Sequence, residues 1–197
     1  MNSYHHGDLR AALLDAAGSI LQEKGVEGFS LRECARRAGT SHAAPAHHFG
    51  DTQGLLSEFA ALGFERMVAM MQGARAAAEP GAADQLRATG RAYIDFALAN
   101  RAAFQLMFRA DRLAGGHAHL DQARGAAFEE LRSALAALHE GSAPQPQLML
   151  AWSAVHGFAT LLLEHATDGV RQGQDVERFS QEMGDAMLAL LRKSLGP

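Results

Sequence analysis

The hydrophobic residues of this chain recur at the three- and four-residue spacing of an amphipathic helix along almost its whole length. The stretches between turn residues lack the strict alternation that is typical of a β-strand, and no internal repeat or low-complexity segment interrupts the pattern. The apolar spacing predicts helices over about 9–24, 31–38, 41–49, 52–78, 86–98, 104–108, 120–138, 147–166 and 175–194. We therefore expect an all-α protein.

Two short predicted helices follow the first one, with a turn between them. Gly25 ends the first run, and Ser30 with Glu33 matches a capping box, in which each side chain satisfies a free backbone N–H at a helix start. A turn over 38–40 leads to the next helix, which Ser41 is expected to cap. This order is the outline of a helix-turn-helix, whose second helix enters the DNA major groove.

Turn residues and apolar surface indicate how the rest of the chain is organised. The segment "EPGAAD" at 79–84 is the best candidate for a boundary. We expect a helix-turn-helix DNA-binding domain over 1–51, a connecting helix over 52–78, and a larger helical domain over 79–197. The last two helices, about 147–166 and 175–194, carry more apolar surface than one small domain needs to bury, which favours a homodimer through them.

Composition narrows the compartment and the partners. With 197 residues, 48 % of them hydrophobic, the chain can bury a sizeable core, and the lone Cys34 cannot form an internal disulfide, which favours a reducing compartment. We find no apolar run long enough to span a bilayer, and "MNSYHHGDLR" lacks the apolar core of a secretion signal. We expect a cytoplasmic protein with no membrane partner. The net charge of −4 argues against non-specific coating of nucleic acid.

The segment "RRAGTSHAAPAHHFGD" at 36–51 holds three histidines, which suit a metal site, a catalytic cluster or a helix offered to a partner. His42 and His47 are five residues apart, whereas ligands on one helix prefer a spacing of three or four. The sequence has no phosphate loop, no G-x-S-x-G and no dinucleotide fingerprint. We therefore expect no metal, no cofactor and no enzymatic activity, which leaves the partner-binding helix.

The residues of the first third sharpen that interpretation. The span from "YHHGDLRAALLDAA" to "FGDTQGLL" resembles the N-terminal DNA-binding domain of TetR-family transcriptional regulators. The matching residues are Gly25, Phe29, Ser30, Ala35, Ala38, Gly39, Ser41, Phe49, Leu55 and Leu56. Farther along, Trp152, His156 and Gly157 resemble the W-x-x-x-H-G signature of the "WHG" type of TetR C-terminal domain.

This resemblance implies an all-helical homodimer that binds a roughly palindromic, double-stranded operator and releases it when a small molecule enters the C-terminal domain. Such a protein is a transcriptional regulator, and we expect a repressor. The residues expected at the DNA are Arg32, Arg36, Arg37, Thr40, Ser41, His42, Ala43, Ala44, His47 and His48.

Two positions depart from the family pattern. Many relatives have a tyrosine where this chain has Ala46 and a lysine where it has Thr52, and both of those side chains commonly touch phosphate. Their absence should weaken operator binding, because residues 1–50 hold five basic and five acidic side chains and offer no surplus charge. The alternative function is a helical ligand-binding homodimer whose DNA binding is weak or lost. Pro45 is a further puzzle, because proline can strain an early helical turn.

Trp152 and His156 are four residues apart and therefore share one helical face. With other apolar residues they are expected to line a pocket for a small apolar or aromatic effector. The candidate pocket residues are Phe96, Phe104, Met107, Phe108, Phe128, Trp152, His156 and Phe158. The alternative is that all eight are ordinary core, with His156 bonded to a backbone carbonyl or a carboxylate.

Overall fold

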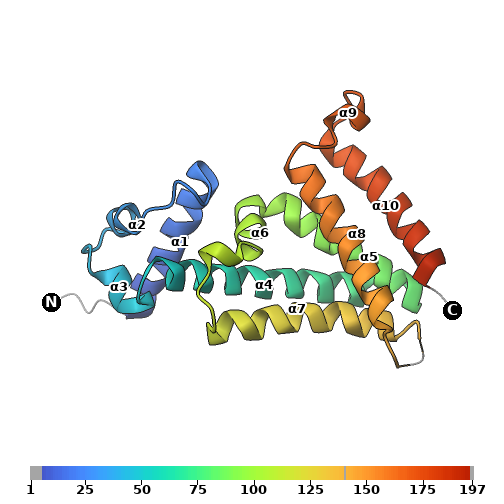
Figure 1. The fold of residues 1–197 in the computed structure, drawn as a ribbon, viewed down its shortest axis with the longest axis horizontal. Coiled ribbons are helices and arrows are strands. Elements are labelled where there is room, and N and C mark those ends of the chain that lie inside the picture. Colours follow the sequence, from blue (N-terminus) through green and yellow to red (C-terminus); the bar gives the residue numbers. More distant parts are fainter. Residues whose placement is uncertain (1–5, 140, 196–197) are drawn as a thin grey trace. The chain divides into compact units, whose positions relative to one another are not determined.

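The structure is a computed structural model that describes residues 6–139 and 141–195 (Figure 1). Residues 1–5, which begin both the segment compared above with a secretion signal and the span that resembles the TetR domain, lie outside the described residues. Within the described ranges every regular element is a helix. The prediction of an all-α protein is confirmed.

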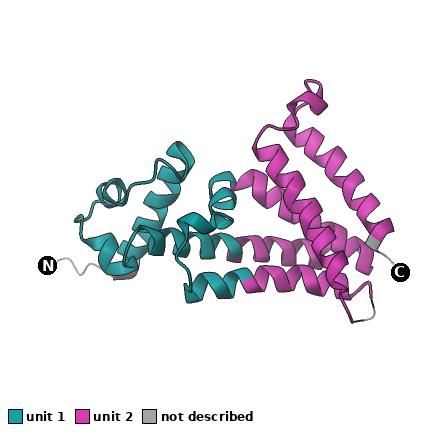
Figure 2. Ribbon diagram, viewed as in Figure 1, with its two compact units in different colours: residues 1–64, 101–124 teal, residues 65–100, 125–197 magenta. Residues whose placement is uncertain are grey.

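The chain folds as two compact units (Figure 2). Unit 1 comprises Met1–Phe64 and Arg101–Arg124, and unit 2 comprises Glu65–Asn100 and Gly125–Pro197. The chain therefore leaves unit 1, enters unit 2, returns and leaves again. The functional division expected at residues 51 and 78 stays a prediction.

Unit 1 is built around the first helices. It contains α1 (His6–Lys24), α2 (Leu31–Arg37), α3 (Ala44–Phe49), the first half of α4 (Thr52–Ala77), α6 (Arg101–Met107), the short 3-10 helix η1 (Ala110–Arg112) and the start of α7 (Ala118–Ala136). Leu13, Ile20, Cys34 and Leu55 are fully buried in its core. The Cys34 thiol donates to the Leu13 carbonyl at 3.2 Å, and burial raises its pKa to about 11. Cys34 therefore behaves as a packed small hydrophobe.

Unit 2 is built around α5. It contains the rest of α4 and α7 together with α5 (Ala82–Ala99), α8 (Gln145–Leu163), α9 (Asp168–Arg171) and α10 (Val176–Leu195). α5 packs against both α8 and α10, and Leu86, Leu135 and Leu148 are buried in the core. The Arg91 guanidinium on α5 donates to the carbonyl of Ser180 on α10 at 2.7 Å and to its hydroxyl at 2.9 Å. These bonds add a polar connection to the apolar packing.

α8 differs from the sequence-based expectation in one respect. By length and composition it is apolar enough to cross a membrane, with a mean hydropathy of 1.2, although the sequence analysis found no such segment. Its buried residues include Ala151, Val155 and Ala159, which occupy one side of the helix. In unit 2 α8 packs on α5 and α10, and 33 % of its apolar window is buried.

Candidate functional site

α2 and α3 form the helix-turn-helix that the sequence predicts. The Ser30 Oγ accepts a hydrogen bond from the Glu33 N–H at 3.5 Å and caps α2. After α2, Gly39 adopts the left-handed conformation with a φ of 65°, and the Thr40 N–H donates to the Ala35 carbonyl at 3.0 Å. This bond and the left-handed glycine close the end of α2 and turn the chain toward α3.

α3 begins later than the sequence predicts. Its first residue is Ala44 and its N-cap is Ala43, which makes no side-chain cap, so the prediction that Ser41 caps this helix is wrong. The Ser41 carbonyl instead accepts from the Ala44 N–H at 3.1 Å and closes a turn before the helix. Pro45 is the second helical residue, where a backbone N–H has no partner within the helix, so the proline costs no hydrogen bond.

The turn and α3 hold seven of the ten predicted DNA-contact residues and expose four of them to solvent. His47 and His48, with ring centroids 5.6 Å apart, are consecutive on the helix and therefore point about 100° apart. One groove can receive only one of them directly. The exposed residues are Ser41, His42, Ala43 and His47, and the partly buried ones are Thr40, Ala44 and His48.

The three predicted arginines differ in what holds them. Arg36 donates two hydrogen bonds to the Glu33 carboxylate at 2.8 Å, and Arg37 donates to Glu33 at 2.9 Å and twice to Glu23 at 2.7 Å. The hydrogen bonds from Arg36 and then Arg37 lower the pKa of Glu33 to about 2, so these pairs are ionised at neutral pH. Arg32 is exposed and makes no ion pair with any described residue. Of the three guanidinium groups, that of Arg32 is therefore the one that is not bonded to a carboxylate of the described residues.

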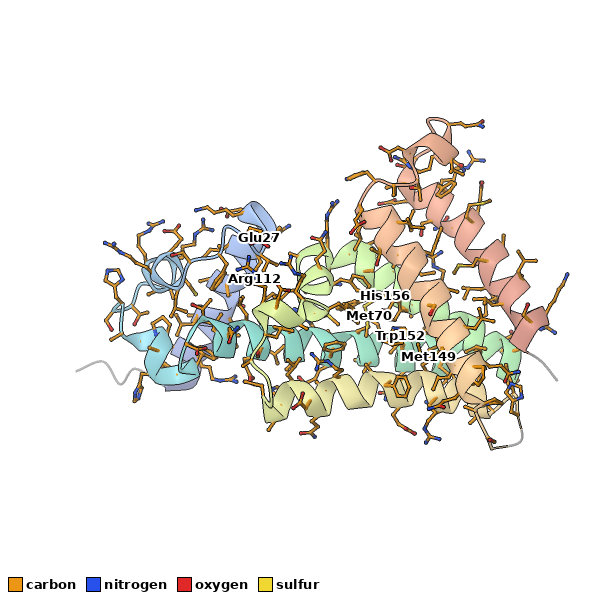
Figure 3. The ribbon with its side chains drawn as sticks, viewed as in Figure 1. Glu27, Met70, Arg112, Met149, Trp152 and His156 are labelled. Carbon is orange, nitrogen blue, oxygen red and sulfur yellow. The ribbon has the colours of Figure 1, made fainter. Side chains whose placement is uncertain are left out.

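A carboxylate that the sequence pattern does not single out joins the turn after α1 to the segment after α6. Glu27 accepts a hydrogen bond from Arg109 at 2.9 Å and pairs with Arg112, and Figure 3 shows Glu27 and Arg112 beside each other. Arg109 also bonds Asp111 at 2.8 Å. These ion pairs hold η1 against the helix-turn-helix part of unit 1.

A second carboxylate joins α4 to α1 and α7. Glu58 is buried, pairs with Arg10, and lies 2.9 Å from the Nδ1 of His119, which must be the donor because a carboxylate only accepts. The Nε2 of His117 is 3.9 Å from the other carboxylate oxygen. Burial acts to raise the pKa of Glu58, but the bonds from His119 and Arg10 outweigh it and the pKa is lowered.

In unit 2, Tyr93 of α5 completes the pair that the sequence predicts on α8. Its hydroxyl lies 2.8 Å from the Nδ1 of His156, and the Trp152 ring centroid is 6.1 Å from that of His156. Trp152 and His156 lie on the same stretch of α8 in Figure 3. The indole N–H of Trp152 acts to lower the pKa of Tyr93, because this group only donates and so favours the phenolate.

These bonds place two neutral polar groups among aromatic rings. Burial raises the pKa of Tyr93, against a weaker lowering by the Trp152 hydrogen bond, and burial lowers the pKa of His156. Both side chains are therefore uncharged at neutral pH. Phe128 stands 6.4 Å from Trp152, ring centroid to ring centroid, and is 42 % exposed. The cluster thus combines aromatic surface, hydrogen-bonding groups and partial access to solvent.

The eight predicted pocket residues divide between the two units. Phe96 is fully buried in unit 2, where Phe158 packs on Phe179 at 6.4 Å between centroids. Phe104, Met107 and Phe108 are in unit 1, and the ring centroids of Phe104 and Phe108 are 5.1 Å apart. Within unit 2 the structure groups Trp152, His156 and Phe128. Whether the pocket includes the others stays a prediction.

Comparison with known proteins places the chain in a family. Residues 13–59 match the family model of bacterial regulatory proteins of the tetR family. Residues 86–187, more than half of the chain, match the model of the tetracyclin repressor-like C-terminal domain, and this span includes Trp152 and His156. The chain belongs to the TetR family. The resemblance seen in the sequence is confirmed, and the protein is a TetR-family transcriptional regulator.

Solved structures share this TetR fold. A protein of unknown function from Rhodococcus sp. RHA1 is 34 % identical, with a TM-score of 0.77 over 96 % of this chain and 98 % of that one. The TetR family regulator PfmR from Thermus thermophilus is 20 % identical, with a TM-score of 0.66 over 92 % and 97 %. FadR from Bacillus subtilis, solved with stearoyl-CoA, is 13 % identical, with a TM-score of 0.69 over 92 % and 96 %. A comparison with curated proteins gave no match.

Proposed function

We propose that this regulator is a cytoplasmic repressor that binds a roughly palindromic operator as a homodimer. The observation that carries the proposal is the helix-turn-helix, in which the turn before α3 and α3 itself expose Ser41, His42 and His47. In a dimer the two α3 helices must lie about 34 Å apart to enter successive major grooves. The hydroxyls of Thr40 and Ser41, in the turn before α3, suit phosphate contact.

The effector we propose is a small apolar or aromatic molecule bound at the Trp152 cluster of unit 2. Aromatic surface with the uncharged Tyr93 and His156 favours a molecule that is mostly apolar and offers a neutral hydrogen-bonding group. FadR shows that this fold can hold a molecule with a long acyl chain. Effector binding releases the operator if the effector has a higher affinity for a conformer in which the recognition helices are spaced differently. The loss of operator affinity cannot exceed the effector's difference in affinity between the two conformers.

The dimer we propose forms through α8 and α10. Both helices expose large apolar side chains although their other sides are buried in unit 2. A surface of this kind on a soluble protein marks an interaction site, and a two-fold axis lets each copy cover the other. The exposed residues are Met149, Leu150, Leu161, Met183 and Leu190.

The experiment is selection of bound fragments from a random duplex pool by the purified protein, followed by a salt titration of the most enriched duplex. We expect a palindrome and a steep loss of affinity with salt. Arg32→Ala should weaken binding across sequences and reduce the salt slope by about 1, because an unpaired guanidinium is the best phosphate contact here. Arg36→Ala, the matched control, should have the smaller effect because Glu33 already occupies that side chain.

A second function is favoured by the charge of the recognition surface. Arg36 and Arg37 are both bound to carboxylates, and Ala46 and Thr52 replace the family's phosphate contacts. The alternative is therefore a ligand-binding homodimer that has largely lost DNA binding. If folded, dimeric protein enriches no duplex, this alternative replaces the repressor proposal.

A further inference from the structure

We call residues 38–64, which form the turn, α3 and the first half of α4, the recognition segment. This segment carries no permanent positive charge. Between Arg37 and Arg66 the sequence contains no lysine or arginine, so the turn, α3 and the first half of α4 lack both. The two arginines that precede the turn are bonded to Glu33 and Glu23. A surface that must meet phosphates is thus nearly empty of cations at high pH.

The same segment holds three of the ten histidines of the chain, and histidine is the side chain that gains charge between pH 8 and 5. His42 lies in the turn before α3, and His47 and His48 lie in the last turn of α3. His42 and His47 are exposed and make no ion pair with any described residue. These two side chains can therefore approach a phosphate without first breaking an ion pair.

The charged groups of the neighbouring segments come from α2, from α1 and from the turn between α3 and α4. α2 packs against α3 and contributes the Glu33, Arg36 and Arg37 network. Arg10 of α1 lies over the Phe49 ring at 5.5 Å, and the Asp51 carboxylate, next to α3, accepts from the Gly54 N–H at 2.8 Å. Each carboxylate among these groups already accepts hydrogen bonds from another partner.

We propose that operator binding is coupled to protonation of His42, His47 and His48, so that the protein binds DNA more tightly as pH falls. The inference rests on the proposed DNA binding. A phosphate beside an imidazole favours the protonated form, so the complex takes up protons when it forms. Because His47 and His48 point in different directions, we expect about one or two protons per recognition helix.

The test is the affinity of the full-length protein for a labelled duplex between pH 8 and pH 6 at constant ionic strength. The probe is the most enriched duplex from the selection, or the random pool itself if none is enriched. Affinity should rise up to about tenfold per pH unit for each proton taken up. The salt slope should steepen by about one for each histidine that reaches a phosphate. An affinity that does not change with pH would overturn the inference and leave the repressor proposal intact.

Two substitutions at one position separate charge from a base contact. His47→Asn should flatten the pH dependence, whereas His47→Arg should bind more tightly at pH 8 and vary less with pH, because its charge is permanent. His165→Asn, an exposed histidine of unit 2 in the left-handed conformation that asparagine tolerates, is the matched control. If His42→Asn, His47→Asn and His48→Asn together leave the pH dependence unchanged, the protons bind elsewhere and the inference is wrong.

Discussion

Glu58 shows how a single buried residue links stability to pH. Its lowered pKa means that the folded state holds the ionised carboxylate more strongly than the unfolded chain does. The resulting stabilisation is present above the unfolded-state pKa and is lost as pH falls through the folded value. We predict that Glu58→Gln lowers the free energy of unfolding by about 1–3 kcal/mol at pH 7, because Arg10 and His119 lose a charged acceptor. Urea denaturation measures this difference.

The same experiment carries its own control. As pH is lowered through the folded-state pKa of Glu58, the difference between wild type and Glu58→Gln should shrink, because the wild-type carboxylate also becomes neutral. Glu129→Gln removes a carboxylate that bonds Arg132 at 2.7 Å on the surface, and this change should cost less stability than Glu58→Gln because solvent screens the exposed pair. Equal stability of wild type and Glu58→Gln at pH 7 would show that the cluster does not hold unit 1 together.

The residues of the candidate ligand site were only partly predictable from the sequence. Trp152 and His156 could be placed on one face because four-residue spacing fixes that geometry within a helix. Tyr93 was missed, although a tyrosine on an apolar helical stripe needs a hydrogen-bond partner when buried. Matching that need with a histidine on another apolar helix is the signal that identifies the pair.

At the scale of an element, α4 offers two glycines with opposite expectations. A Cβ on Gly54 would lie 1.9 Å from the Phe49 carbonyl oxygen, which belongs to the backbone at the end of α3. Gly54→Ala must therefore shift α3 relative to α4, and we predict a loss of about 1–3 kcal/mol together with weaker DNA binding. Gly73→Ala meets no atom within 4 Å and should stabilise the protein by about 0.5–1 kcal/mol.

Thermal unfolding of the two variants beside wild type decides this prediction. The pair shares one helix and one chemical change, so helix propensity alone would move both in the same direction. Opposite shifts support the close approach of α3 and α4 at Gly54. A stabilising Gly54→Ala would show that the turn at Phe49 has room that the structure does not contain.

The long helices were predictable because several turns of apolar spacing identify each of them. η1 and α9, with three and four residues, were missed because they are too short to show a period. The start of α3 was misplaced because Ser41 is a good cap by residue type, yet its carbonyl closes a separate turn before the helix. The local pattern therefore predicted which long helices exist better than it predicted the residue at which each helix begins.

For the whole molecule, the sequence did not reveal which helices pack together. Glu27 and Arg109 are 82 positions apart, and nothing in either local pattern connects them. As a result the expected boundary near residue 79 did not show that residues 101–124 return to unit 1. Pairs that determine packing over such distances leave no periodic signal in one sequence.

The proposed assembly gives the last prediction. Leu161 on α8 is 48 % exposed and Leu190 on α10 is 64 % exposed in the single chain. If two copies meet through these helices, a two-fold dimer buries each of these leucines in both copies. Leu161→Glu therefore removes apolar burial and buries a charge at two places in the interface. We predict a dimer dissociation constant raised at least about 100-fold, since burial of two half-exposed leucines is worth roughly 1.5–3 kcal/mol and two buried carboxylates add to that loss.

Analytical ultracentrifugation and operator titration test this assembly together. Val170→Glu is the matched control, because Val170 on α9 is 69 % exposed and lies outside the proposed interface. Leu161→Glu should sediment as a monomer and lose most of its operator affinity, because one recognition helix alone contacts a single half-site. Val170→Glu should remain a dimer with unchanged affinity. A dimeric Leu161→Glu would place the interface elsewhere, whereas a monomer with full operator affinity would separate DNA binding from dimerisation.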